Sequence, residues 1–166
     1  DEIATATDQN RYVAWPYTKY MNAMNQINQS AALLLTSVDH ARKLGISEDK
    51  FIYLHGCSDT KEKSILGRQN YYASEAMRVM AEQVFANNSA SGDLGIDDIE
   101  HIDFYSCFPS AVAMARDTFG LSVDDPRQLT VTGGLPFHGG AGTNYVMNSI
   151  AAMVDKVRSD TRSFVL

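Results

Sequence analysis

The chain has few cysteines, no long apolar run and no concentration of positive charge. Only Cys57 and Cys107 are present, without metal-ligand spacing, which excludes a disulfide-stapled scaffold and a cysteine-based zinc site. Each cysteine ends a β-favouring run, which favours inert packing over a nucleophilic thiol. No apolar stretch has the length of a membrane span, and the polar start at Asp1 does not resemble a signal peptide. We therefore expect a cytoplasmic protein that does not associate with a membrane.

Positive charge is scarce and dispersed. The 14 Lys and Arg residues are scattered against 20 Asp and Glu residues, and the net charge is −6. Nucleic-acid-binding domains concentrate Lys and Arg on one face, so no nucleic-acid partner is expected. The 166 residues are 45% hydrophobic and 20% charged, which predicts one ordinary soluble domain large enough to form a core.

Glycine, in contrast, is concentrated around one histidine. Within residues 132–145, glycines occupy five positions on both sides of His138. Glycine adopts backbone conformations that are closed to other residues and lets a ligand approach the main chain. This cluster makes His138 the leading catalytic candidate, as a general base or as an oxyanion donor. A turn histidine that bonds a carbonyl is the alternative.

The glycine-rich loop is predicted to join a strand to a helix. A β-favouring run at 129–132 precedes the loop, and apolar residues recur at helical spacing from Val146 to Val157. Backbone N–H groups and the positive dipole end at a helix N-terminus favour negative charge. The loop could therefore face a phosphate, a thiolate or the oxyanion of a tetrahedral intermediate.

Strand-like and helix-like segments alternate along the remaining chain. The expected strands are 31–38, 51–55, 102–106, 129–132 and 163–166, and the expected helices are 40–44, with Asp39 as its cap, 73–85, 110–119 and a final helix that ends near residue 158. Repeated strand and helix units predict an α/β fold in which helices cover a sheet. The polar and aromatic first residues predict an incoming arm. The last apolar strand ends abruptly, which predicts a segment of a longer protein.

Four segments in order resemble the C-terminal half of thiolases, closest to the sterol-carrier-protein-type and thiolase-like acetyl-CoA acetyltransferases. Residues 28–35 resemble the segment that leads into the first strand of that half, and residues 97–103 resemble its approach to the catalytic strand. Residues 105–108 stand at the family's Asn-Glu-Ala-Phe or His-Asp-Cys-Phe motif. Residues 133–142 stand at its loop containing Gly-His-Pro, with glycine in place of the proline.

The resemblance implies a thiolase-fold half, an α/β layered helix–sheet–helix sandwich with a mixed sheet that is truncated at its last strand. It divides the chain into an incoming arm from the loop domain, residues 1–27, and an incomplete C-terminal thiolase domain, residues 28–166. It also implies partners: the N-terminal thiolase half, and further copies in a homodimer or tetramer.

The resemblance further implies a C-terminal catalytic domain of an acyl-CoA acyltransferase, which transfers acyl groups between CoA and a cysteine on the N-terminal half. The isolated chain would be inactive. His138 would activate the cysteine and help to bind the thioester oxygen, and Tyr105 stands where an Asn or His contributes to the oxyanion hole. Asn25 stands at a CoA-contacting serine, and Gly139 and Gly140 would also contact CoA. The CoA thioester is then a substrate, and no metal or covalently bound cofactor is expected.

Alternatives for two residues and for the function remain open at this point. Tyr105 is equally consistent with a strand aromatic that packs in the core, and Asn25 is consistent with a solvated loop residue. Ser106, at the place of an acidic residue, favours a catalytically degenerate subunit that binds CoA thioesters or serves as a scaffold. A structural fragment whose exposed sheet edge pairs with a partner is the third interpretation.

Overall fold

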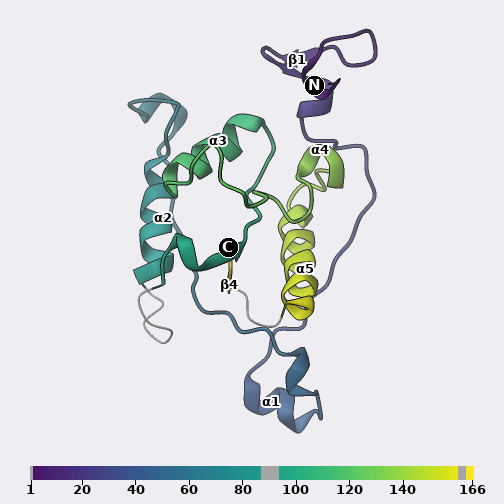
Figure 1. Ribbon diagram of the computed structural model, residues 1–166, viewed down its shortest axis with the longest axis vertical. Coiled ribbons are helices and arrows are strands. Elements are labelled where there is room, and N and C mark those ends of the chain that lie inside the picture. Colours follow the sequence, from purple (N-terminus) through teal and green to yellow (C-terminus); the bar gives the residue numbers. More distant parts are fainter. Residues whose placement is uncertain (1, 87–93, 161–163) are drawn as a thin grey trace.

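The computed structural model describes residues 2–86, 94–160 and 164–166, which form a mixed α/β arrangement that is mostly helical (Figure 1). The α-helices are α1 (Val38–Lys43), α2 (Glu75–Ala86), α3 (Pro109–Thr118), α4 (Leu135–His138) and α5 (Asn144–Ser159). The strands are β1 (Tyr12–Ala14), β2 (Tyr17–Thr18), β3 (Ile99–His101) and β4 (Phe164–Val165). Strands β1 and β2 pair antiparallel, and β3 and β4 pair parallel as a separate sheet.

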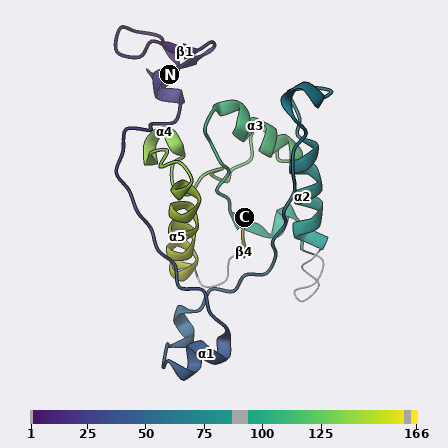
Figure 2. The same ribbon diagram turned by 180° about the vertical axis from the view of Figure 1, so that it is seen from behind.

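The strand pair β3–β4 lies between two groups of helices. Helices α2 and α3 lie on one side of it and α5 on the other, and the view from behind shows the same order (Figures 1 and 2). The β1–β2 hairpin and α1 lie at opposite ends of the molecule. None of the helices in the described ranges combines the length and the hydropathy that a membrane crossing needs.

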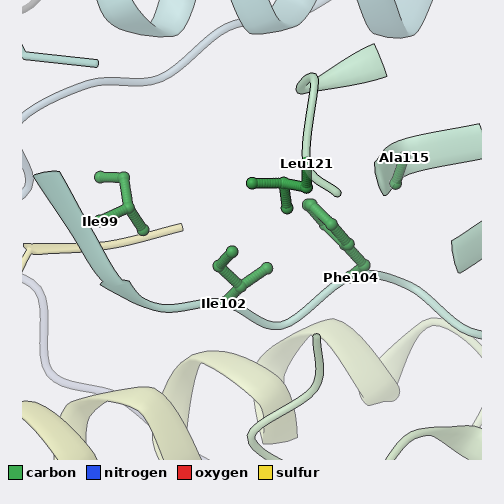
Figure 3. Packing of buried hydrophobic residues seen from close by; sticks show 5 residues of the cluster. All are labelled: Ile99, Ile102, Phe104, Ala115 and Leu121. Carbon is green, nitrogen blue, oxygen red and sulfur yellow. The ribbon is translucent and has the colours of Figure 1, made fainter. Parts of the chain in front are cut away.

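The hydrophobic core lies where β3 and the segment after it meet α2 and α3. Its buried members, shown in Figure 3, are Ile99, Ile102, Phe104, Ala115 and Leu121. Phe119 stacks on Phe104 with ring centroids 5.3 Å apart and meets Phe85 edge-on at 6.2 Å. Ile102, Phe104 and Ser106 are buried, and this period of two places Tyr105 on the opposite face of the extended segment.

Two of the expected strands, 31–38 and 51–55, are not formed, and the strand expected at 102–106 is wrong in position, because the strand there is β3, at Ile99–His101. Residues 31–37 and 51–64 form neither strand nor helix, and Leu34, Leu35 and Leu54 are 75%, 87% and 74% exposed. A strand forms only when a neighbour satisfies its backbone N–H and C=O groups, and the described chain supplies no paired strand for these segments. The predicted layered sandwich with a mixed sheet is therefore not formed by these residues.

The expected strand at 129–132 is also not formed, for a different reason. Only its first residue joins the extended segment, because the Phe104 amide donates to the Leu129 carbonyl at 2.9 Å. The amides of Val131 and Thr132 instead donate to the Asp103 side chain. The Asp103 carboxylate thus accepts the hydrogen bonds that the carbonyl groups of a neighbouring strand would otherwise accept. The final strand is confirmed as β4, although Ser163 lies outside the described residues.

The helices are predicted more accurately than the strands. The expected helices 73–85 and 110–119 correspond to α2 and α3. Helix α1 begins at Val38 and is capped by Ser37, whose hydroxyl accepts from the His40 amide at 3.3 Å, rather than by Asp39. A serine hydroxyl and an aspartate carboxylate fill the same position equally well, so either residue could have served.

The surface of the chain is large for its mass. The accessible area is 11533 Å² for 18.3 kDa, whereas a compact monomer of this mass exposes about 8,100 Å². The exposed leucines at 33–35 and 54 contribute to the difference. Much apolar surface that a compact domain buries therefore faces outward in this segment.

An ion pair fixes the turn that precedes β3. Nη1 of Arg127 donates to the carbonyl oxygens of Ile96 at 2.7 Å and Ile99 at 2.8 Å. The Asp125 carboxylate accepts from Nε and Nη2 of Arg127 at 2.9 and 2.7 Å, and from the Arg127 amide at 3.0 Å. Asp125 therefore holds the guanidinium group that ties this turn to the core.

These hydrogen bonds predict a specific acid sensitivity. They lower the pKa of Asp125 from 3.8 to about 2, the Arg127 side chain contributing most. A depressed carboxyl pKa stabilises the fold above the unfolded pKa, and this stabilisation is lost as the pH falls from about 4 toward 2. We expect Asp125→Asn in the complete protein to lower the melting temperature at neutral pH and to lose less on acidification than wild type. Thermal unfolding across this pH range measures both effects.

The matched control is Asp124→Asn, which changes an exposed neighbouring carboxylate. This control should retain the acid sensitivity of wild type. Equal acid sensitivity of Asp125→Asn and wild type would contradict the assignment.

Candidate functional site

The glycine-rich loop contains one additional helical turn. Helix α4 stands between residue 132 and α5 and carries His138 at its last position. Gly133 and Gly134 precede the turn with φ of +86° and +79°, and Gly139 follows it with φ of +106°. The His138 amide donates to the Gly134 carbonyl at 2.8 Å. The glycines therefore make possible the two sharp changes of direction that place His138 at the end of α4.

Ser106 fixes the start of this turn. Its buried Oγ accepts from the Leu135 amide at 3.0 Å. A Cβ atom at Gly134 would lie 2.6 Å from this oxygen, so only glycine fits there. Ser106 thus orients the loop that bears His138, although the sequence identified it only as a departure from the family motif.

The N-terminal arm lies along the other side of the loop. The Met24 amide donates to the Leu135 carbonyl at 3.1 Å, and the Gly140 amide donates to the Met24 carbonyl at 2.6 Å. Nε2 of Gln29 donates to the His138 carbonyl. Residues far apart in the sequence therefore hold the backbone of the loop from both sides.

The structure brings His138 and Tyr105 together around a third residue, Tyr145. The Tyr145 ring centroid lies 5.9 Å from that of His138 and 5.6 Å from that of Tyr105, and both contacts are edge-to-face. Tyr145 is 1% exposed, whereas Tyr105 is 51% exposed. Tyr105 is therefore not a core aromatic, and its half-exposed ring lies on the same tyrosine as the His138 imidazole.

One nitrogen of His138 has no hydrogen-bond partner in the described part of the chain. Its Nε2 atom is buried, yet nothing among the described residues forms a hydrogen bond with it. A buried polar atom without a hydrogen bond carries a desolvation penalty of about 1–3 kcal/mol, and such atoms are rare in native proteins. His138 therefore presents an imidazole nitrogen that a group from outside this segment could satisfy.

The other predicted site residues, Asn25, Gly139 and Gly140, lie where the N-terminal arm meets the loop. Asn25 is exposed and follows Met24, the residue that binds Gly140. The amides of Gly139 and Gly140 are both used internally, the first by the Leu135 carbonyl at 3.2 Å. Any contact of these glycines with a ligand would therefore involve their Cα atoms or carbonyl oxygens rather than their N–H groups.

Sequence reasoning missed a partly buried polar cluster around Tyr145, the tyrosine that contacts His138. Oδ1 of Asp103 accepts from the amides of Val131 and Thr132 at 2.7 and 3.0 Å and from Oγ1 of Thr132 at 3.0 Å. Its Oδ2 accepts from the hydroxyls of Ser149 and Tyr145, the latter at 3.4 Å. The Tyr145 hydroxyl also lies 2.8 Å from Oγ1 of Thr132. Burial raises the pKa of Tyr145, although its hydrogen bond with Thr132 opposes the rise.

A signal for Asp103 was present in the sequence. The period of two in an extended segment places Asp103 on the same face as Tyr105, opposite the buried Ile102 and Phe104. A carboxylate next to a candidate site residue could therefore have been assigned to the site. Tyr145 had no comparable signal, because it reads as an ordinary residue of the first helical turn.

A cavity of about 400 Å³ adjoins the loop, with mainly apolar walls that include Tyr20, Val112, Gly134 and Phe137. Within residues 2–86, 94–160 and 164–166, no group of three or more His, Cys, Asp or Glu side chains is placed to hold a metal ion.

Comparison with known proteins identifies a solved structure that is similar to this chain. No protein-family model and no curated protein matches the chain. The chain is similar to a solved structure, a monomeric SCP2-thiolase-like protein type 1 from Mycobacterium smegmatis, with 43% identity and a TM-score of 0.89. The match covers 99% of this chain and 35% of that protein.

Proposed function

The chain belongs to the thiolase superfamily as a thiolase-like segment, and on this premise we propose that it is the C-terminal catalytic part of an acyl-CoA acyltransferase. The observation that carries the proposal is the unpartnered, buried Nε2 of His138, at the end of a glycine-bounded turn. The chain spans 35% of its solved relative, so the activity belongs to a longer protein.

In the proposed reaction, His138 activates a cysteine thiol that lies outside this segment. The neutral imidazole accepts the thiol proton, and the thiolate attacks the carbonyl carbon of an acyl-CoA. The new carbon–sulfur bond gives a tetrahedral intermediate, whose collapse breaks the bond to the CoA sulfur. The CoA thiolate then takes the proton from the imidazolium, which leaves an acyl-cysteine and free CoA. An ordinary cysteine is only a few per cent thiolate near neutral pH, so an imidazole partner raises the reactive fraction.

Tyr105 is the proposed oxyanion donor. A phenol hydroxyl donates a hydrogen bond, and the half-exposed Tyr105 lies against the same ring as His138. Donors held in place before the reaction stabilise the charge that develops on the thioester oxygen. Asn25, Gly139 and Gly140 are proposed to contact CoA. Their common position along the arm and the loop supports this assignment.

The N-terminal part of the same protein is the proposed partner of the exposed apolar surface. The large accessible area and the exposed Leu34, Leu35 and Leu54 support this, because such surfaces are normally buried. In the complete protein we expect residues 31–38 and 51–55 to join the layered sheet. Assembly into a homodimer or tetramer stays a prediction. The solved relative is described as monomeric, which argues against it.

The proposal is tested by thiolysis of acetoacetyl-CoA with the complete protein, followed by mass spectrometry after mixing with acyl-CoA. We expect turnover and an acyl adduct on a cysteine outside residues 1–166. CoA binding with neither adduct nor turnover would contradict the proposal and favour the second candidate, a degenerate thiolase-like subunit or scaffold. The observation that favours that candidate is the internal use of the Gly139 and Gly140 amides, which leaves neither as an oxyanion donor.

A further inference from the structure

Tyr145 contacts both proposed catalytic side chains, His138 and Tyr105. It belongs to the first turn of α5 and is among the largest fully buried side chains of the described residues. Its ring meets His138 at an interplanar angle of 75° and Tyr105 at 79°. A single buried ring therefore contacts side chains that come from two different segments.

The hydroxyl of Tyr145 fixes the ring relative to the rest of the site. It lies within hydrogen-bonding distance of Oγ1 of Thr132, at 2.8 Å, and of Oδ2 of Asp103, at 3.4 Å. The same carboxylate binds the Ser149 hydroxyl, one turn further along α5. Asp103 therefore joins the start of the loop to the helix that follows it, and the tyrosine stands between them.

The loop itself offers little to orient an imidazole. Glycines flank α4 on both sides, and a glycine-rich backbone loses much conformational freedom when it is fixed. The His138 backbone is held through the Gly134 and Gln29 contacts, but these bonds leave its side-chain torsions free. Among the described residues, the ring contact of the His138 side chain is with Tyr145.

We propose that Tyr145 is a positioning residue for the acyl transfer, which sets the orientation of the His138 imidazole through its ring and is held in place by Asp103 and Thr132. The inference rests on the proposed function and names a further residue of that site. Displacement of a reacting group by about 1 Å can cost about 10²-fold in rate. Loss of the Tyr145 ring should therefore lower kcat with little change in KM.

The test compares Tyr145→Leu and Tyr145→Phe in the complete protein labelled with ¹³C-histidine. The His138 ring resonance is assigned by its disappearance in His138→Asn. Tyr145→Leu should shift this resonance, because the ring current of the tyrosine is lost, and should lower kcat by about 10²-fold. Tyr145→Phe keeps the ring but loses the hydroxyl contacts with Asp103 and Thr132, so its resonance shift and its loss of kcat should both be smaller than those of Tyr145→Leu. Met153→Ala is the matched control, because it removes a buried side chain from α5 about 12 Å along the helix.

The spectrum separates this inference from the proposed function. A shift in Tyr145→Leu that is absent in Met153→Ala supports the ring contact with His138 even if the wild-type protein shows no acyl transfer, and a fall in kcat without a change in KM supports the positioning of the imidazole. An unmoved His138 resonance in Tyr145→Leu, or an equal shift in Met153→Ala, would overturn the inference whatever the activity. An unchanged kcat in Tyr145→Leu, with an active wild type, would also overturn it.

Discussion

Replacement of His138 by alanine in the complete protein should lower acyl transfer from acyl-CoA by about 10²- to 10⁴-fold, the usual contribution of a positioned general base. The melting temperature should change little, because Nε2 has no hydrogen-bond partner among the described residues that the substitution would break. The measurements are kcat/KM for thiolysis and thermal unfolding of the same preparation. Together they separate lost chemistry from lost folding.

His40→Ala is the matched control, because His40 is an exposed histidine on α1, at the far end of the molecule from the β1–β2 hairpin (Figure 1). It should leave both kcat/KM and the melting temperature unchanged. Wild-type turnover in His138→Ala would remove this histidine from the mechanism. A fall in turnover that follows a fall in melting temperature would assign it a structural function instead.

Gly134→Ala should cost about 2–5 kcal/mol of stability and remove activity together with it. The backbone at this residue has φ of +79°, a region that L side chains rarely adopt, and an added Cβ would lie 2.6 Å from Oγ of Ser106. Relief of this overlap would require Ser106 to release the Leu135 amide. Denaturant unfolding of the complete protein measures the loss.

Two variants separate backbone strain from the steric overlap. Gly45→Ala also places alanine at a positive φ, +72°, but no atom lies within 4 Å of the added Cβ. It should cost only about 1–2 kcal/mol. Ser106→Gly combined with Gly134→Ala removes the overlap and should recover part of the stability. Equal losses in Gly45→Ala and Gly134→Ala would show that the contact with Ser106 is unimportant.

Local patterns predicted the longer helices, whereas pairing between segments was not predictable. The helices α2, α3 and α5 follow from apolar spacing, which depends on residues only three or four positions apart. Residues 31–38 have the composition of a buried strand, but a strand needs a partner that composition does not identify. The single turn α4 was not predicted, because the glycine and proline residues in and around it are typical of a loop.

The roles of the predicted site residues stay predictions, although two of these residues share a neighbour in the structure. His138 and Tyr105 were expected from the motifs, and the structure places both against Tyr145. The period of two places Asp103 on the same face as Tyr105, but the contact of Asp103 with Tyr145 spans 42 positions of the sequence, and no local period predicts it. The assignment of Asn25, Gly139 and Gly140 to CoA stays a prediction.

The long sequence separation of the contacts around His138 has a consequence for the order of folding. Gln29 binds the His138 carbonyl across 109 positions and the Asn148 side chain across 119. Loops of such length close slowly and at a cost in chain entropy that must precede any gain from the contact. The core around Phe104 and Phe119 depends on much nearer residues. We therefore expect the loop to acquire its final shape late, after that core, so that a newly synthesised chain gains reactivity last.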